Sequence, residues 1–168
     1  KEDPLRLLRG ARLTAQYDLN IDEFTETQIK KSSFLISKIS SERIRDEFLK
    51  LLSLQKSVRN LTKMDKLGIL TNIIPELEAS RETLQSPNHY WKVLEHMVQT
   101  VGQAENIVAG KKINAGPYPN FTPNYIPITD AHQIYFEQNY SDSHSRFTFL
   151  KLSCLLHDVG KPKTKTVD

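Results

Sequence analysis

Apolar residues recur at helical spacing along most of this chain, and no segment shows the alternation of apolar and polar residues expected of a half-buried strand. Signals that begin helices, such as Asp3-Pro4 and Ser40, alternate with glycines that end them, such as Gly68 and Gly110. The sequence therefore predicts an all-α fold.

A break in the pattern near Pro87 divides the chain into two expected domains, residues 1–82 and 83–168. The expected helices begin near residues 4 and 25 and span about residues 42–54, 57–67, 90–109 and 145–158, the last closed by Gly160 with Pro162 preventing its continuation. Residues 111–140, rich in proline and aromatic residues, are expected to form an irregular insertion. Its aromatic side chains either stack on RNA bases or pack over neighbouring helices, and we favour packing because few basic residues lie nearby.

Composition excludes several classes of protein. None of the apolar runs in the 168 residues approaches the roughly 20 residues that cross a bilayer. A single cysteine, Cys154, excludes a disulfide framework and a cysteine-rich zinc site. The net charge of +3 does not by itself indicate a nucleic-acid-binding protein. The chain has no secretory signal and no initial Met, so we expect a cytoplasmic protein and a segment of a longer chain.

A row of charged residues opens the sequence. Asp3 and Arg6 are three residues apart and share one face of the expected helix, and Arg9 continues the row. Spacing alone favours a helix-capping aspartate followed by a solvated arginine stripe.

Three segments, in this order, resemble one family. Residues 2–16 are similar to the E-D-x-x-R motif and following helix of class II RNA nucleotidyltransferases, which are tRNA CCA-adding enzymes and bacterial poly(A) polymerases. Residues 39–52 resemble the family's I-S-x-E-R-I-R-x-E-x-x-K-L-L neck segment, and residues 67–77 its G-L-L-x-x-I-L-P-E-L turn. The three matches in family order are more specific than any one of them.

The resemblance implies that Asp3 and Arg6 read the base of the incoming nucleotide. A carboxylate accepts from an exocyclic amine and an arginine donates in a fixed plane, which suits adenine and cytosine. ATP is therefore the expected substrate, with CTP a second candidate. By the same analogy Arg9 steadies the site or touches phosphate. Arg43 and Arg45 either bind RNA or pair with neighbouring carboxylates, and we favour pairing for most of these charges.

The family's catalytic head carries a G-G-x-V-R-D loop and an Asp-x-Asp pair that hold Mg²⁺, and neither motif occurs in this sequence. The resemblance thus implies a neck and body without the head, inactive alone in nucleotidyl transfer. The complete protein is expected to add nucleotides to the 3′ end of tRNA or another RNA.

Residues 155–162 resemble the signature of the HD superfamily, whose members are often metal-dependent phosphohydrolases. The resemblance implies a divalent metal held by His96, His157 and Asp158. The family's fourth ligand is an aspartate far downstream, and Asp168 lies too near the motif to fill that role. The second domain is then the beginning of an HD subdomain with an incomplete metal site. For this chain alone we favour the other interpretation, a capping Asp158 and histidines at the edge of a core.

Two other functions stay open. One is an HD phosphohydrolase that acts on a nucleotide or a 2′,3′-cyclic phosphate. The other is a non-catalytic helical module that binds RNA, for which salt-sensitive binding without nucleotide preference is the expected signature.

Overall fold

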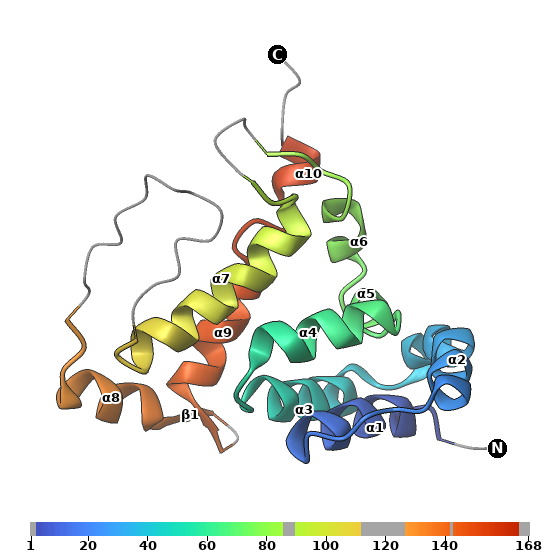
Figure 1. Cartoon of the computed structure of the whole chain (residues 1–168), viewed down its shortest axis with the longest axis horizontal. Helices are drawn as coiled ribbons and strands as arrows, with labels where there is room; N and C mark the ends of the chain where they lie inside the picture. Colours follow the sequence, from blue (N-terminus) through green and yellow to red (C-terminus); the bar gives the residue numbers. More distant parts are fainter. Residues whose placement is uncertain (1–2, 86–89, 112–126, 142, 165–168) are drawn as a thin grey trace. The chain divides into compact units, whose positions relative to one another are not determined.

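The computed structural model describes residues 3–85, 90–111, 127–141 and 143–164, and these are mostly helical, which confirms the all-α prediction (Figure 1). The chain divides into two compact units, Lys1–Ala79 and Ser80–Asp168, each described separately below. None of the helices in the described ranges combines the length and apolar character needed to span a membrane.

The first unit is a chain of short helices. They are α1 (Leu5–Gln16), α2 (Glu23–Ser32), the 3₁₀ helix η1 (Ser33–Lys38), α3 (Ser41–Leu52), α4 (Ser57–Lys66) and α5 (Leu70–Ile73), with α6 (Glu76–Ser80) at the boundary between the units. The second unit contains α7 (Val93–Val108), α8 (Asp130–Glu137), the strands β1 (Asn139–Ser141) and β2 (His144–Ser145), α9 (Arg146–Leu156) and α10 (Lys161–Thr164).

Helices α1 and α3 lie side by side in the first unit, and α4, α5 and η1 complete its core (Figure 1). Each helix presents an apolar stripe inward. The buried residues of these stripes include Leu5, Leu8, Ile36, Phe48, Leu51, Leu52, Leu61, Met64, Ile69 and Leu70. In α3, Phe48, Leu51 and Leu52 are buried in this core.

One charged side chain lies inside the contact between α1 and α3. Glu47 of α3 is only 4% exposed. Its Oε2 accepts a hydrogen bond from Arg12 Nε of α1 at 2.9 Å, and its Oε1 lies 3.5 Å from Arg9 Nε and 3.4 Å from Lys50 Nζ. Burial raises the pKa of Glu47, but the hydrogen bond and charge of Arg12, with Lys50, outweigh it and hold that pKa below its usual value. The carboxylate therefore stays ionised and ties α1 to α3.

A left-handed glycine ends α4 as predicted. Gly68 has a φ of +69°, its N–H bonds to Asp65 O, and Ile69 N–H bonds to Met64 O, the two bonds of a Schellman motif. A Cβ at Gly68 would lie 3.0 Å from Ser33 Oγ of η1. The motif thus ends α4 and turns the chain, so that the buried Ile69 and α5 follow at once.

In the second unit α7 and α9 lie side by side (Figure 1). The apolar side chains buried here include Val93, Leu94, Met97, Val98, Val101 and Leu155. Lys151 is also buried, 1% exposed, and its Nζ pairs with Glu105 Oε1 at 2.6 Å and lies 4.7 Å from the centre of the Phe147 ring. The pair joins α9 to α7 inside the core.

Helix ends and the insertion depart from the predictions in four places. Helix α2 begins at Glu23, not Thr25, because Asp22 accepts the Thr25 N–H at 2.9 Å and caps it. Helix α7 begins at Val93, three residues later than predicted. The chain resumes helix at Lys161 after Gly160, with Pro162 tolerated because it falls in the first turn of α10.

The fourth departure is in the predicted irregular insertion. Its residues 130–141 form α8 and β1, and β1 pairs with β2 in an antiparallel hairpin. Thr129 N–H donates to His132 Nδ1 at 3.1 Å across the first turn of α8, one half of a capping box. Residues 112–126 of the insertion, and Pro87, lie outside the described residues.

Glu47→Gln is expected to reduce the free energy of unfolding at pH 7 by about 1–3 kcal/mol, because a charged acceptor with several donors becomes neutral. The pKa of Glu47 is lower in the folded than in the unfolded chain. Its contribution is therefore complete above the ordinary pKa of 4.5 and disappears as the pH falls through the folded value.

Urea unfolding followed by circular dichroism between pH 7 and pH 3 measures this difference. The gap between wild type and Glu47→Gln should narrow at acidic pH. The control is Glu26→Gln, which removes an exposed pair with Lys30 and should change stability little. Equal effects of the two variants would contradict the assigned role of Glu47.

Candidate functional sites

Asp3 is held at the start of α1 by two donors. Its Oδ1 accepts the Leu5 N–H at 3.1 Å, and its Oδ2 pairs with Arg43 of α3. Helix α1 therefore begins at Leu5, one residue beyond the predicted first position, with Pro4 preceding it. The hydrogen bond from Arg43, then that from Leu5, lowers the pKa of the half-exposed Asp3 carboxyl. The carboxylate is thus oriented, ionised and accessible.

The predicted arginines fall into different surroundings. Arg6 is exposed on the first turn of α1, next to Asp3 in the chain. Arg9 lies near the buried Glu47. Arg43 pairs with Asp3, a partner that the sequence did not suggest, and Arg45 donates to Asp46 Oδ1 at 2.8 and 3.0 Å. The favoured pairing of these arginines with carboxylates is therefore observed for Arg43 and Arg45.

His96, His157 and Asp158 come together in the second unit, although 61 residues separate the histidines. His96 comes from α7, and His157 and Asp158 follow the end of α9. The two histidine Nε2 atoms are 3.2 Å apart, and Asp158 Oδ2 lies 3.5 Å from His96 Nε2 and 3.2 Å from His157 Nε2. One ligand atom from each of the three lies within 4.8 Å of the others.

Two observations favour a cation at this cluster. His157 Nδ1 donates to the Cys154 carbonyl at 2.7 Å, so in the neutral ring Nε2 carries the lone pair that faces His96. Asp158 Oδ2 is shielded from solvent, and among the described residues no donor reaches it with good hydrogen-bond geometry. The Lys161 ammonium lies 2.6 Å from this oxygen and supplies one positive charge. Two imidazoles and a carboxylate form a donor set suited to transition-metal ions.

Cys154 lies one turn before His157 in α9. Burial raises the pKa of its thiol, which reduces the thiolate fraction. This environment suits a packing residue better than a nucleophile.

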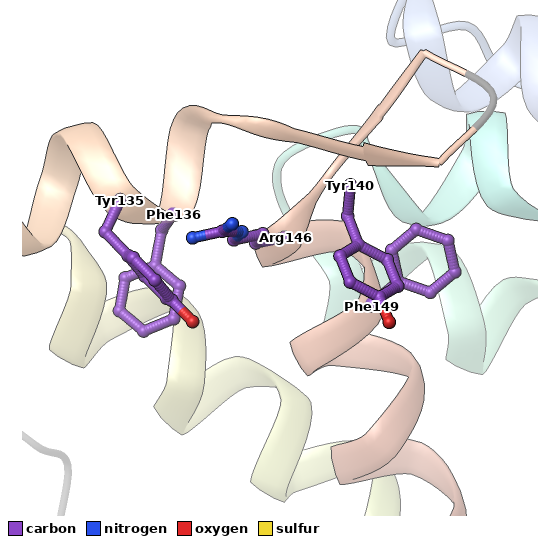
Figure 2. Close-up of a pocket in the computed structure, with 5 residues that line it drawn as sticks. All are labelled: Tyr135, Phe136, Tyr140, Arg146 and Phe149. Atoms are coloured by element: carbon purple, nitrogen blue, oxygen red, sulfur yellow. The ribbon is translucent and has the colours of Figure 1, made fainter.

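A cavity of about 270 Å³ opens between α8, the hairpin and α9 (Figure 2). It is lined by Tyr135, Phe136, Tyr140, Arg146 and Phe149. The sequence signalled the aromatic residues but not Arg146, which comes later in the chain and joins them only because the hairpin folds back. Arg146 N–H bonds to Gln138 O at 2.9 Å, which closes that turn.

Comparisons with known proteins bear on the first unit most directly. Residues 18–81 match the family model described as "Probable RNA and SrmB- binding site of polymerase A". The chain is 37% identical over 84 residues to a CCA-adding enzyme of Lactobacillus helveticus, a match that covers 50% of this chain and 21% of the relative.

Two further relatives align with both units. An A-adding tRNA nucleotidyltransferase of Deinococcus radiodurans is 25% identical over 169 residues, covering 98% of this chain and 31% of the relative. A bifunctional uridylyltransferase/uridylyl-removing enzyme of Caulobacter vibrioides is 28% identical over 167 residues, covering 95% of this chain and 15% of the relative. The chain thus spans about a third or less of the length of each of these three relatives.

Over residues 18–81 the chain is thus similar to the probable RNA-binding region of polymerase A, and over parts of its length it is similar to CCA-adding enzymes and a poly(A) polymerase. These similarities agree with the family resemblance of its three ordered motifs.

Replacing Arg43 with Gln is expected to raise the pKa of Asp3 toward the ordinary 3.8, because its largest stabilising hydrogen bond is lost. Carboxyl chemical shifts of Asp3, followed by NMR through an acid titration, measure the change. The matched control is Arg45→Gln, which removes the partner of Asp46 and should leave the Asp3 titration unaltered. An Asp3 titration unaffected by Arg43→Gln would contradict the pairing.

Proposed function

We propose that this chain is the base-reading neck and RNA-binding body of a nucleotidyltransferase that extends the 3′ end of tRNA or another RNA. The proposal assigns ATP, with CTP as the second candidate, to the nucleotide and assigns the protein to the cytoplasm. Phosphoryl transfer needs a catalytic head with carboxylates that hold Mg²⁺, which this sequence lacks.

The ordered Asp3 carboxylate is the observation that supports base reading most strongly. Leu5 N–H and Arg43 use one lone pair on each oxygen, which leaves acceptor capacity for an exocyclic amine of adenine or cytosine. Arg6 follows at the same helix end and offers donors for a ring nitrogen or carbonyl. Uracil and guanine present a carbonyl where this carboxylate requires a donor, so they are disfavoured.

The contact between α1 and α3 supports this role. Arg12 and Arg9 of α1, the helix that follows Asp3, reach Glu47 of α3. Arg43 of α3 reaches back to Asp3. The two links fix the base-reading end of α1 relative to the neck helix. Arg9 is therefore assigned to steadying the site, and Arg45 remains a candidate for RNA contact.

Asp3→Ala and Arg6→Ala, in the protein that joins this chain to a catalytic head, should reduce the preference for ATP over UTP by about 10- to 100-fold. This is the effect of losing one charged hydrogen bond. Single-nucleotide incorporation with each of the four nucleotides measures kcat/KM. Asp130→Ala, at an exposed aspartate of α8, is the control and should not alter base preference. An unchanged ATP preference in both test variants would reject base reading by these residues.

A second candidate function is metal-dependent phosphohydrolysis by the second unit. It is favoured by the His96, His157 and Asp158 cluster and by the similarity across both units to a uridylyl-removing enzyme. A bound divalent ion would supply Lewis-acid stabilisation of a phosphate. His96 and His157 would offer Nε2 and Asp158 would offer Oδ2, while Cys154 O fixes the tautomer of His157.

Calorimetric titration with Ni²⁺, Co²⁺ or Mn²⁺ at pH 7.5 tests this candidate. His157→Ala should weaken binding at least tenfold, since even the loss of an outer partner costs that much. His132→Ala is the control. The hydrolase is supported if the wild-type chain binds metal and hydrolyses a 2′,3′-cyclic phosphate, and if His157→Ala loses that hydrolysis. Metal binding that His157→Ala leaves unchanged would exclude this cluster as the metal site.

A further inference from the structure

The aromatic cavity of the second unit has no role in either proposed activity. Tyr135 and Phe136 come from the last turns of α8, Tyr140 from β1, and Arg146 and Phe149 from α9. Figure 2 shows the Arg146 side chain between the two aromatic pairs, with its guanidinium directed toward Tyr135. We propose that this cavity binds an unpaired base of single-stranded RNA, with Arg146 contacting the adjoining phosphate. The proposal rests on RNA being the substrate.

The rings that line the cavity are presented to solvent rather than sealed in the core. Tyr140 is 69% exposed and Tyr135 is 52% exposed. Tyr140 packs edge-on against Phe149 with ring centres 5.3 Å apart, and Tyr135 packs edge-on against Phe136 at 5.5 Å. The edge-on contact with Phe149 supports the Tyr140 ring, whose large exposure leaves surface available for stacking.

Arg146 supplies the charge. Its guanidinium carbon lies 4.2 Å from the centre of the Tyr135 ring, a stacked cation–π geometry. Within the described ranges no carboxylate forms an ion pair with Arg146. A stacked guanidinium keeps its N–H groups in its own plane, where they can donate to a phosphate in a bidentate manner.

The size and shape of the cavity favour one base. Its volume of about 270 Å³ lies just below the roughly 300–1,000 Å³ of sites that take drug-sized ligands. Aromatic rings with an interleaved arginine are the usual platform for single-stranded nucleic acid, because every base has a π-face and every nucleotide a negative phosphate. Charge complementarity favours RNA over an apolar peptide, which would leave the guanidinium without a partner.

The β1–β2 hairpin brings Tyr140 of β1 close to Arg146 and Phe149 of α9. Asn139 pairs with Ser145 and Ser141 with His144, and the N–H of Arg146 bonds to Gln138 O. Ser145 then caps α9 by accepting the Thr148 N–H at 3.3 Å. These bonds bring Tyr140 and Arg146 to the lining of the same cavity.

The test measures binding of a fluorescein-labelled adenosine hexanucleotide to the whole 168-residue chain by anisotropy, beside an abasic oligomer with the same number of phosphates. Tyr140→Leu keeps apolar bulk but removes the π-face, and Arg146→Gln removes the charge. Tyr140→Leu should weaken binding of the hexanucleotide about tenfold and leave the abasic oligomer unchanged. Arg146→Gln should weaken binding of both oligomers.

Tyr90→Leu is the matched control, because Tyr90 is a similarly exposed tyrosine of the same unit outside the cavity. Circular dichroism verifies that each variant is folded. Photo-crosslinking with 4-thiouridine in the oligonucleotide should label Tyr135 or Tyr140, as read by mass spectrometry.

RNA binding unchanged by Tyr140→Leu, or reduced equally by Tyr90→Leu, would overturn the base site and leave the proposed nucleotidyltransferase function intact. Failure of the whole chain to bind the hexanucleotide contradicts the cavity as an RNA site. Base preference in nucleotide incorporation is a separate readout, so Asp3 and Arg6 can fail while the cavity site holds.

Discussion

The buried carboxylate of Glu47 determines how the first unit is organised. A charge removed from water is tolerated only with donors, and Arg12, Arg9 and Lys50 supply them from both helices of the contact. The same ion pair that satisfies Glu47 also holds α1, which begins at Leu5, against α3. Arg43 adds a second link at the start of α1, where it pairs with Asp3. Charged pairs therefore hold the α1–α3 contact at two places.

The second unit also contains a buried charge that is satisfied across a contact between two helices. Lys151 is buried against Glu105, and this pair joins α9 to α7 in the core. The end of α9 then presents His157 and Asp158 toward His96 of α7. The packing of α9 on α7 thus brings the three potential ligands together. At the other end of α9, this helix, α8 and the β1–β2 hairpin form the cavity lined by aromatic side chains and Arg146.

Local signals predicted most helices but misjudged the regions where two signals competed. The sequence predicts that a helix begins near Thr25, but Asp22 accepts the Thr25 N–H and caps the helix two residues earlier. The prolines and aromatics of residues 111–140 indicated irregular structure, yet α8 forms where the prolines stop, capped through Thr129 and His132. The hairpin strands were too short to produce detectable alternation. Boundaries therefore failed where a capping side chain, rather than apolar periodicity, decided the outcome.

Periodicity and short contiguous motifs were enough to predict the all-α class and the family resemblance of the chain, because both depend on residues that lie close together in the sequence. Tertiary structure alone decided that Arg43 would meet Asp3 across 40 residues. It also decided that Glu47 would be buried with its charge, and that Arg146 would fold back onto Tyr135. Pairing of charges and rings between elements depends on how the helices pack. The spacing of residues within one helix does not predict which neighbouring element that helix will contact.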